Sequence, residues 1–326
     1  MPVKIRKLRS LDRDDVMEIS RHVWEGHDYL PSVFESWLND ENSHFYGVEQ
    51  DGRVVAVANL RLLEGGRTGW MEGLRVHPDY RGKGYANAMT QFLVRKAEDL
   101  SVERLRYTTG DNNAASLRLA SMAGFQKLLE KTVFWCAKPK KAPTVRGYLP
   151  IDETKPERAF ELLKTNPSLV LHGVLVYDWK AVDSTPENLE EIGQDHGFFV
   201  ALKNGKLDSM SFGHSRQDLE KTWGFTVYAS DSEGFLAQLS FNMTRALEAG
   251  SDWVMGTFGR EFEERLRQID FGCEEQDIGH LVLLEKQSSK PIDASRKEST
   301  SFCHIPHTFL ADKSGGVTRS VRFKVG

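Results

Sequence analysis

Residues Met71 to Ala86 read Met-Glu-Gly-Leu-Arg-Val-His-Pro-Asp-Tyr-Arg-Gly-Lys-Gly-Tyr-Ala. This stretch predicts a strand, a turn interrupted by Pro78, a glycine-rich loop and the start of a helix. The loop from Arg81 to Gly84 combines glycines, which let backbone N–H groups approach a ligand, with two cations and the positive end of the helix. The stretch therefore predicts a phosphate-binding loop, and this combination suits a pyrophosphate.

The spacing of this loop separates it from other phosphate-binding loops. Neither Gly-x-x-x-x-Gly-Lys-Ser/Thr nor Gly-x-Gly-x-x-Gly fits it, which disfavours a P-loop NTPase and a dinucleotide-binding domain. It reads instead Arg-x-x-Gly-x-Ala, preceded by Glu-x-Leu-x-Val-x-Pro. This pattern resembles the acetyl-CoA loop of the GNAT N-acetyltransferases. The resemblance implies acetyl-CoA as the acetyl-donor cosubstrate, bound by Leu74, Arg75, Val76, Arg81, Gly82, Lys83, Gly84, Tyr85 and Ala86.

A second element of the same family follows one helix and one strand downstream. Asn112-Asn113-Ala114-Ala115-Ser116 is followed by Leu119 and by Gly124-Phe125. The segment resembles the family's Asn-x-Ala-Ala sequence, in which the Asn contacts the pantetheine arm, and so adds Asn113 and Ser116 to the expected cofactor contacts. Asn113 also suits the N-cap of a helix that ends at Gly124, and both roles are compatible.

The order of the elements expected in the first 138 residues is that of the GNAT fold. An opening strand over 3–8 precedes helices over 12–23 and 33–38. Strands over 45–50 and 53–62 flank a two-residue turn at Asp51-Gly52, and a third strand carries Glu72. A helix over 85–100, with apolar residues at three- or four-residue steps, a strand over 104–108, a helix ending at Gly124 and a strand over 131–137 complete the order. The resemblance implies an α/β fold with a mixed central sheet.

A weaker copy of this order is expected after a charged connector over 139–146. A hairpin around Asn204-Gly205, a strand over 222–229, a helix over 234–249 and further elements predict a degenerate GNAT-like domain over 147–287. Its loop, Tyr228 to Gly234, carries two carboxylates and no cation. Because these charges repel a pyrophosphate, we expect this copy to bind no CoA. It could cover the first domain, complete the substrate pocket or support a homodimer.

The composition limits the compartment and the partners. The 326 residues carry a net charge of -4 and 40% hydrophobic residues, which suits about two domains and disfavours a nucleic-acid partner. No apolar run is long enough to cross a bilayer, and the first residues lack the apolar core of a signal peptide, so we expect no membrane partner and a cytoplasmic location. Three scattered cysteines favour a reducing compartment over a disulfide framework.

The last residues, 288–326, are expected to form a tail or a peripheral strand. Cys303, His304 and His307 lie in it, but they are too few for a metal site without a second cluster of ligands. We therefore expect no metal in this protein.

The acceptor side of the site is expected between the first two helices. Asp28 could hold an ammonium or imidazolium group, while Tyr29 and Trp37 could stack on a ring or a cation. The alternatives are that Asp28 caps a helix and that both aromatic residues belong to the core. With the degenerate second domain, this region resembles the histidine N-acetyltransferase branch of the family. The resemblance implies a small-molecule amine as acceptor, such as the free amino acid histidine.

The expected chemistry is direct attack of a neutral amine on the thioester. Glu72 is the candidate base, because burial on its strand would raise its pKa. The alternative is a structural Glu72 that binds the backbone or Arg75. A backbone N–H near Leu74 or Arg75 would stabilise the developing oxyanion.

One position departs from the family's pattern. Many members place a Tyr that protonates the thiolate where this chain has Ala120. Tyr85, Tyr107, Tyr29 or solvent could replace it. A non-catalytic acyl-CoA-binding or sensing protein, and a protein or peptide N-acetyltransferase, remain alternatives to an enzyme that acts on small molecules.

Overall fold

The computed structural model describes residues 3–23, 26, 28–144, 148–217 and 220–288. These residues form two compact units. The first comprises the described residues up to Leu128 together with 283–288, and the second runs from Leu129 to Val282. The expected tail lies outside the described residues from 289 onward, and with it Cys303, His304 and His307.

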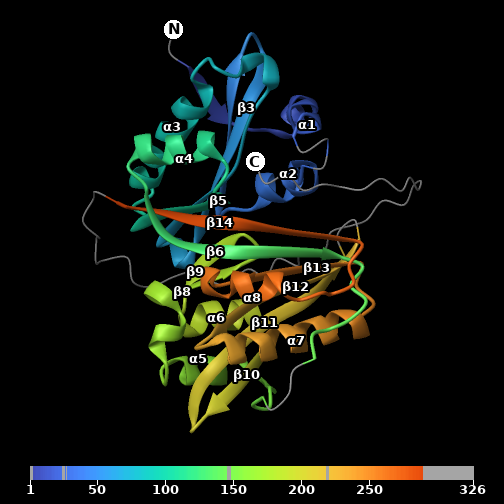
Figure 1. Cartoon of the computed structure of the whole chain (residues 1–326). Helices are drawn as coiled ribbons and strands as arrows, with labels where there is room; N and C mark the ends of the chain where they lie inside the picture. Colours follow the sequence, from blue (N-terminus) through green and yellow to red (C-terminus); the bar gives the residue numbers. More distant parts are fainter. Residues whose placement is uncertain (1–2, 24–25, 27, 145–147, 218–219, 289–326) are drawn as a thin grey trace. The chain divides into compact units, whose positions relative to one another are not determined.

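The first unit is a mixed sheet covered by helices on both faces. Its strands are β1 (Lys4–Lys7), β2 (Ser43–Gln50), β3 (Arg53–Leu63), β4 (Thr68–Val76) and β5 (Arg104–Gly110), in that spatial order. The pairs from β1 to β4 are antiparallel, and β4 pairs with β5 in parallel. Its helices are α1 (Arg13–Arg21), α2 (Leu30–Asn39), α3 (Tyr85–Asp99) and α4 (Ala114–Ala123), with α1 and α2 on one side of β3 and α3 and α4 on the other (Figure 1).

Each face of this sheet is packed by an amphipathic helix surface. Val16, Ile19, Phe34 and Trp37 of α1 and α2 pack with Phe45 and other strand residues into one buried cluster. On α3, Met89, Leu93 and Ala97 are fully buried, as their spacing predicts. Burial of these side chains fixes α3, and with it the direction in which its N-terminus points.

Strand β4 is interrupted by a bulge just after Glu72. Glu72 pairs with Asn59 and Arg75 pairs with Val57, so two residues of β4 face the single residue between their partners on β3. The extra residue is accommodated at Gly73, whose φ is +67°. A Cβ at this position would lie 2.8 Å from Cζ3 of Trp37, so both the backbone conformation and the close packing require glycine. Such a bulge bends a strand and releases backbone groups from the ladder.

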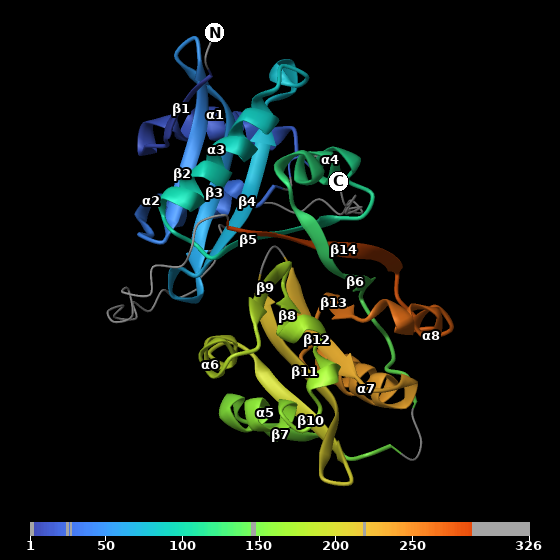
Figure 2. The ribbon, with the colours of Figure 1, turned by 90° about the vertical axis from the view of Figure 1, so that its left-hand side faces the viewer.

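The second unit repeats the order of the first. Its elements are β6 (Gln126–Ala137), β7 (Asp152–Thr154), α5 (Pro156–Leu163), β8 (Val174–Tyr177), β9 (Lys180–Asp183), α6 (Pro186–Gly193), β10 (Gly197–Lys203), β11 (Lys206–Gln217), β12 (Lys221–Ala229), α7 (Ser232–Glu248), β13 (Trp253–Phe258), α8 (Glu263–Arg267) and β14 (Glu275–Gln287). Its strands follow the spatial order β7-β10-β11-β12-β13-β6 (Figure 2). The two-stranded sheet β8-β9 is an insertion relative to the first unit. The expected α/β fold with a second, degenerate copy is therefore confirmed.

The boundaries of the two compact units in the sequence differ from the expected domain boundaries. Strand β6 begins in the first unit and ends in the second, and β14 does the reverse. The expected domains, 1–138 and 147–287, remain a prediction, while the compact units divide at Leu128/Leu129 and Val282/Leu283.

The structure corrects the expectation of free cysteines. Cys136 at the end of β6 and Cys273 before β14 form a disulfide within the second unit, with their Cα atoms 5.9 Å apart. They are separated by 137 residues in the sequence, and such a pairing is set by the fold rather than by spacing. Among the described residues, no helix is both long and apolar enough to cross a membrane.

Candidate functional site

The glycine loop, Arg81 to Gly84, is exposed and leads directly into α3. Gly82 and Gly84 have φ values of +75° and +84°, and a Cβ at either would meet nothing within 4 Å. Gly84 is the N-cap of α3, and no side chain of the described residues caps that end. The first N–H groups of a 15-residue helix are thus left for an external acceptor, which is the arrangement that binds anions.

The glycine loop also carries two cations, Arg81 and Lys83. The Arg81 Nε donates to the Val76 carbonyl at 3.3 Å, which ties the loop to the end of β4. The Lys83 ammonium lies 4.5 Å from the centroid of the Tyr80 ring. Tyr85, the first residue of α3, donates through its hydroxyl to Gln50 Oε1 at 3.3 Å. The loop therefore has a defined shape with its positive groups at the surface.

The start of α4 lies on the same side of the sheet as α3 (Figure 1). Asn113 Oδ1 accepts the N–H of Ser116 at 3.0 Å, so Asn113 is the N-cap of α4, and the helix ends at Gly124 with φ +81°. The Ser116 carbonyl accepts the Tyr107 hydroxyl at 3.2 Å. The helix-cap role of Asn113 is present, and contact with a pantetheine arm stays a prediction.

Side chains of the neighbouring strand β3 hold the carboxylate of Glu72 in place. Its Oε1 accepts Asn59 Nδ2 at 3.0 Å and lies 3.6 Å from Arg61 Nε, and its side chain is 13% exposed. Asn59 is fully buried and also donates to Ser43 Oγ at 2.8 Å. The expected structural partner, Arg75, is replaced by Arg61. Glu72 is therefore oriented by two side chains and still reaches solvent beside the bulge.

Asp28 and Arg75, expected on the acceptor and cofactor sides respectively, bind each other. Arg75 Nε lies 3.2 Å from Asp28 Oδ2 and Nη2 lies 3.1 Å from Oδ1, while the Asp28 side chain is fully buried. Arg75 Nη1 also donates to the Leu74 carbonyl at 3.1 Å. This bidentate pair satisfies the charge of Asp28 within the protein. Direct binding of an ammonium group by Asp28 is therefore disfavoured.

Tyr29 lies at the edge of this pair. The Arg75 guanidinium is 5.4 Å from the centroid of the Tyr29 ring, and the residue as a whole is 37% exposed. Burial of the hydroxyl end raises the pKa of Tyr29, with the nearby carboxylates of Glu72 and Asp28 adding to the rise and Arg75 opposing it. The phenol thus stays protonated at neutral pH near Glu72.

Trp37 is a core residue. It is 3% exposed and packs edge-on against Phe45, with ring centroids 5.0 Å apart. Its ring lies where a side chain at Gly73 would be, so it supports the bulge from beneath. The expectation that Trp37 stacks on a ligand is corrected, because its aromatic faces are used in packing.

Proteins with similar sequences identify the family to which this chain belongs. The family model described as "Acetyltransferase (GNAT) family" matches residues 9–125. An acetyltransferase of Yersinia pestis is 31% identical over 117 residues, which are 33% of this chain and 79% of that protein. The chain belongs to the GNAT acetyltransferase family.

Two further comparisons extend beyond the first unit. A histidine N-acetyltransferase of Oreochromis niloticus is 30% identical over 209 residues, 55% of this chain and 58% of that protein. The chain therefore matches little more than half the length of this relative. A crystal structure of a GCN5-related N-acetyltransferase from Sphaerobacter thermophilus aligns with a TM-score of 0.60 at 14% identity, over 90% of this chain and 98% of the other. This likeness shows that the fold extends over both GNAT units.

The second GNAT unit differs from the first at both features of the candidate site. Strands β11 and β12 pair in continuous register from Ser209 opposite Ala229 to Gln217 opposite Lys221, so this pair has no counterpart of the bulge in β4. At the start of α7, Asp231 Oδ1 accepts the N–H of Gly234 at 2.8 Å. A carboxylate of the chain itself thus caps the N-terminus of α7, the helix that corresponds to α3 of the first unit.

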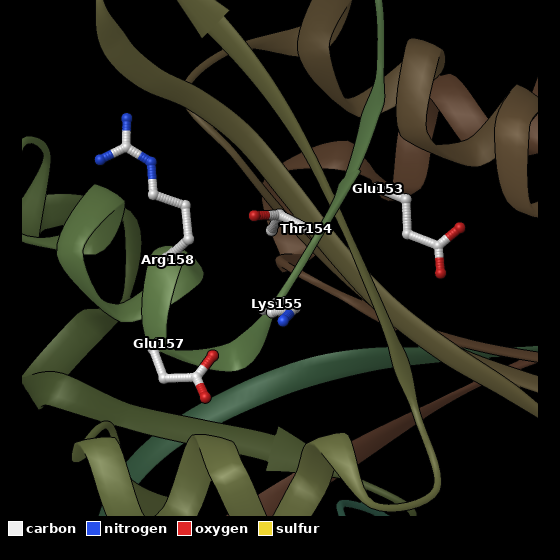
Figure 3. Close-up of a pocket in the computed structure, with 5 residues that line it drawn as sticks. All are labelled: Glu153, Thr154, Lys155, Glu157 and Arg158. Atoms are coloured by element: carbon white, nitrogen blue, oxygen red, sulfur yellow. The ribbon is translucent and has the colours of Figure 1, made fainter.

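Two surface pockets lie apart from Glu72 and the glycine loop. One, of about 470 Å³, is lined in the second unit by Glu153, Thr154, Lys155, Glu157 and Arg158, whose side chains diverge (Figure 3). Another, of about 670 Å³ in the first unit, is lined by residues of α1 and by His77, Pro78 and Asp79. Neither includes Glu72 or the glycine loop.

Sequence reasoning missed Asn59 and Arg61. Both lie on β3. The two-residue turn at Asp51-Gly52 predicts that β2 and β3 pair, but it does not reveal which residues of β3 face Glu72. Polar residues within an apolar strand, Ala-Asn-Leu-Arg, were the available signal. The bulge hides the pairing, since it shifts the register of β4 against β3 by one residue.

Proposed function

We propose that the first unit is an acetyl-CoA-dependent N-acetyltransferase that acetylates the amine of a small molecule, with the free amino acid histidine as the leading candidate. The observation that carries the proposal is the placement of Glu72. Its carboxylate is oriented by Asn59 and Arg61 and stands at the bulge of β4, the strand that leads into the glycine loop. The proposed proton acceptor thus lies on β4, and the proposed anion-binding loop follows soon after the end of the same strand.

The glycine loop fits the diphosphate of acetyl-CoA. The open space beside Gly82 and Gly84, the uncapped N-terminus of α3 and the cations of Arg81 and Lys83 are the features a diphosphate requires. Tyr85 and Ala86 then form the first turn of α3 against it. We place the pantetheine arm along β4, from Val76 to Leu74, and toward Asn113 and Ser116 at the start of α4.

In the proposed reaction Glu72 accepts a proton from the acceptor ammonium, directly or through one water. The neutral amine then attacks the thioester carbonyl, so that a C–N bond forms, the C–S bond breaks and CoA leaves as a thiolate, while the nitrogen, now part of the amide, gives up its second proton to solvent. A backbone N–H near Leu74, beside the bulge, would stabilise the oxyanion that develops. The roles of Asn59 and Arg61 are to hold the carboxylate of Glu72 in place.

Tyr107 is our candidate for the proton donor to the thiolate. Ala120 is buried and has no proton to give, and the Tyr107 hydroxyl bonds the Ser116 carbonyl, one helical turn before Ala120. Burial raises the pKa of Tyr107, so its hydroxyl carries a proton at neutral pH. Tyr85 is less suited, because its hydroxyl donates to Gln50 on β2 and not to a residue of α4, the helix that carries Ala120.

On the acceptor side we propose that Tyr29 contacts the substrate and that Asp28 positions Arg75. Tyr29 is the partly exposed member of the group, whereas the Asp28 side chain is buried under Arg75. The relatives named histidine N-acetyltransferases support an amino acid as acceptor.

The test is release of free CoA thiol by the full chain with acetyl-CoA and a panel of amino acids, polyamines and peptides. Saturable release with a single amino acid supports the proposal. Release with peptides alone would indicate a protein or peptide N-acetyltransferase. Binding of acetyl-CoA without release in any mixture would indicate a non-catalytic sensor and overturn the proposal.

A further inference from the structure

A cluster of three metal-ligating side chains lies in the second unit, apart from the candidate acetyltransferase site. It consists of Asp178 from the turn between β8 and β9, His196 just before β10, and His214 on β11. Asp178 Oδ2 is 3.6 Å from His196 Nε2 and 3.7 Å from His214 Nε2. Three potential ligand atoms thus converge from three separate segments of the chain.

We propose that Asp178, His196 and His214 bind a Zn²⁺ ion with one coordination position left open. Tetrahedral zinc with bonds of 2.0–2.2 Å places its ligand atoms about 3.4 Å apart, so the two observed separations need to close by only a few tenths of an ångström. Two imidazoles and one carboxylate are a zinc ligand set, and three protein ligands leave the fourth position for water or an exogenous ligand. This inference does not depend on the proposed acetyltransferase function.

The tautomer of His196 suits this role. Its Nδ1 lies 3.1 Å from the carbonyl oxygen of Ile192. A carbonyl oxygen can only accept, so Nδ1 carries the proton and, in the neutral ring, Nε2 presents a lone pair toward Asp178. A backbone carbonyl that orients the other nitrogen of a histidine is the usual second contact of a metal ligand.

Asp178 is also held for ligation. Arg216 Nη1 donates to Oδ1 at 3.0 Å and leaves Oδ2 toward the two histidines. The guanidinium offsets the carboxylate's charge, so affinity must come mainly from the imidazoles. We therefore expect Zn²⁺ to be preferred over Mg²⁺ and Ca²⁺, which need several oxygen ligands.

The backbone that presents Asp178 is strained. Asp178 and Trp179 form the two-residue turn between β8 and β9, with φ values of 43° and 64°, and neither is glycine. Trp179 stacks with Trp135 of β6, with ring centroids 6.3 Å apart. Strain of this kind persists where packing enforces it and is common at functional sites. The inserted hairpin, which the first unit lacks, is thus the element that brings the carboxylate over β11.

The experiment is calorimetric titration of the chelator-treated full chain with ZnCl₂. We expect one Zn²⁺ per chain, and binding weakened at least 10- to 100-fold in His214→Ala, since even loss of an outer contact costs that much. His22→Ala is the matched control, because His22 belongs to a second, more exposed cluster with Glu18 and His77. Wild-type protein without zinc binding, or binding that is lost in His22→Ala and kept in His214→Ala, overturns the proposal.

A second measurement needs no variant and so is independent of whether His214→Ala folds. Wild-type chain titrated with CoCl₂ should develop the intense visible absorption of four-coordinate Co²⁺, and added Zn²⁺ should abolish it. The weak spectrum of hexahydrated Co²⁺ at all concentrations would contradict the site.

Discussion

Asn59 Nδ2 donates to Glu72 Oε1 at 3.0 Å across the β3–β4 pair, and Asn59 itself is fully buried. The bond sets the direction of the carboxylate that we propose as the base. Replacing Asn59 by Ala should lower kcat by about tenfold and leave acetyl-CoA affinity within about twofold, because the lost bond orients Glu72 and does not touch the glycine loop. Steady-state kinetics with Asn42→Ala, an exposed asparagine, is the control. An unchanged kcat in Asn59→Ala would show that Glu72 needs no orientation from β3.

The bulge at Gly73 should be sensitive to a single methyl group. Gly73→Ala adds a Cβ at positive φ and within 2.8 Å of Trp37, so we expect a loss of stability of about 2–4 kcal/mol. Gly52→Ala is the matched control, because Gly52 also has positive φ, +80°, but open space around it. Chemical unfolding of both variants separates the backbone cost, common to the two, from the clash with Trp37. Equal losses of stability in Gly73→Ala and Gly52→Ala would mean that Trp37 moves away from the added methyl group at no cost in free energy.

The glycine loop should bind the cosubstrate once per chain. Arg81→Ala combined with Lys83→Ala removes both cations, and we expect acetyl-CoA affinity to fall about 10- to 100-fold with little change in stability, since both side chains are exposed. Titration calorimetry gives both the affinity and the stoichiometry. A stoichiometry of two would contradict the assignment of the second unit as unable to bind CoA, in which Asp231 caps α7.

Tyr107→Phe tests the proton donor. We expect acetylation to slow by about tenfold or less, below the usual range for a general acid, because a thiolate leaves without much assistance. The measurement is kcat, with Tyr85→Phe as the matched control. A larger effect in Tyr85→Phe would move the role to the start of α3.

The second unit should lose stability in acid through Glu263. Its carboxylate is partly desolvated, which raises its pKa, but His280 at 2.7 Å and Arg267 at 2.6 Å outweigh this and hold the pKa at about 2. A lowered pKa gives stability that is complete above the ordinary value of 4.5 and disappears as the pH falls toward 2. Unfolding of wild type and Glu263→Gln between pH 6 and pH 2 should converge at the acid end, while Glu264→Gln should follow wild type throughout. A constant difference between wild type and Glu263→Gln would exclude the linkage.

Local patterns predicted the elements that frame the site. The spacing of Met89, Leu93 and Ala97 indicates α3, and Arg81 to Gly84 indicates the loop before it, because both signals lie within one turn or one helix of sequence. Contacts between distant residues could not be read this way. The Asp28–Arg75 pair spans 47 residues and the Cys136–Cys273 disulfide 137, so each depends on how the strands assemble.

Trp37 shows a second limit of the sequence. An aromatic residue near a polar loop suits a binding site and a core equally, and burial beneath Gly73 decides between them. The cluster of Asp178, His196 and His214 was likewise invisible, because the three residues are spread over separate segments of the second unit without a ligand spacing.

Glu72→Gln separates the role of Glu72 as a base from the binding of acetyl-CoA. The substitution keeps the size of the side chain and its contact with Asn59 but removes the proton acceptor. With the full chain, acetyl-CoA and the best amine, we predict that CoA thiol release falls by at least about 100-fold while acetyl-CoA affinity, measured by calorimetry, stays within about twofold. Equal release by Glu72→Gln and wild type would contradict the account.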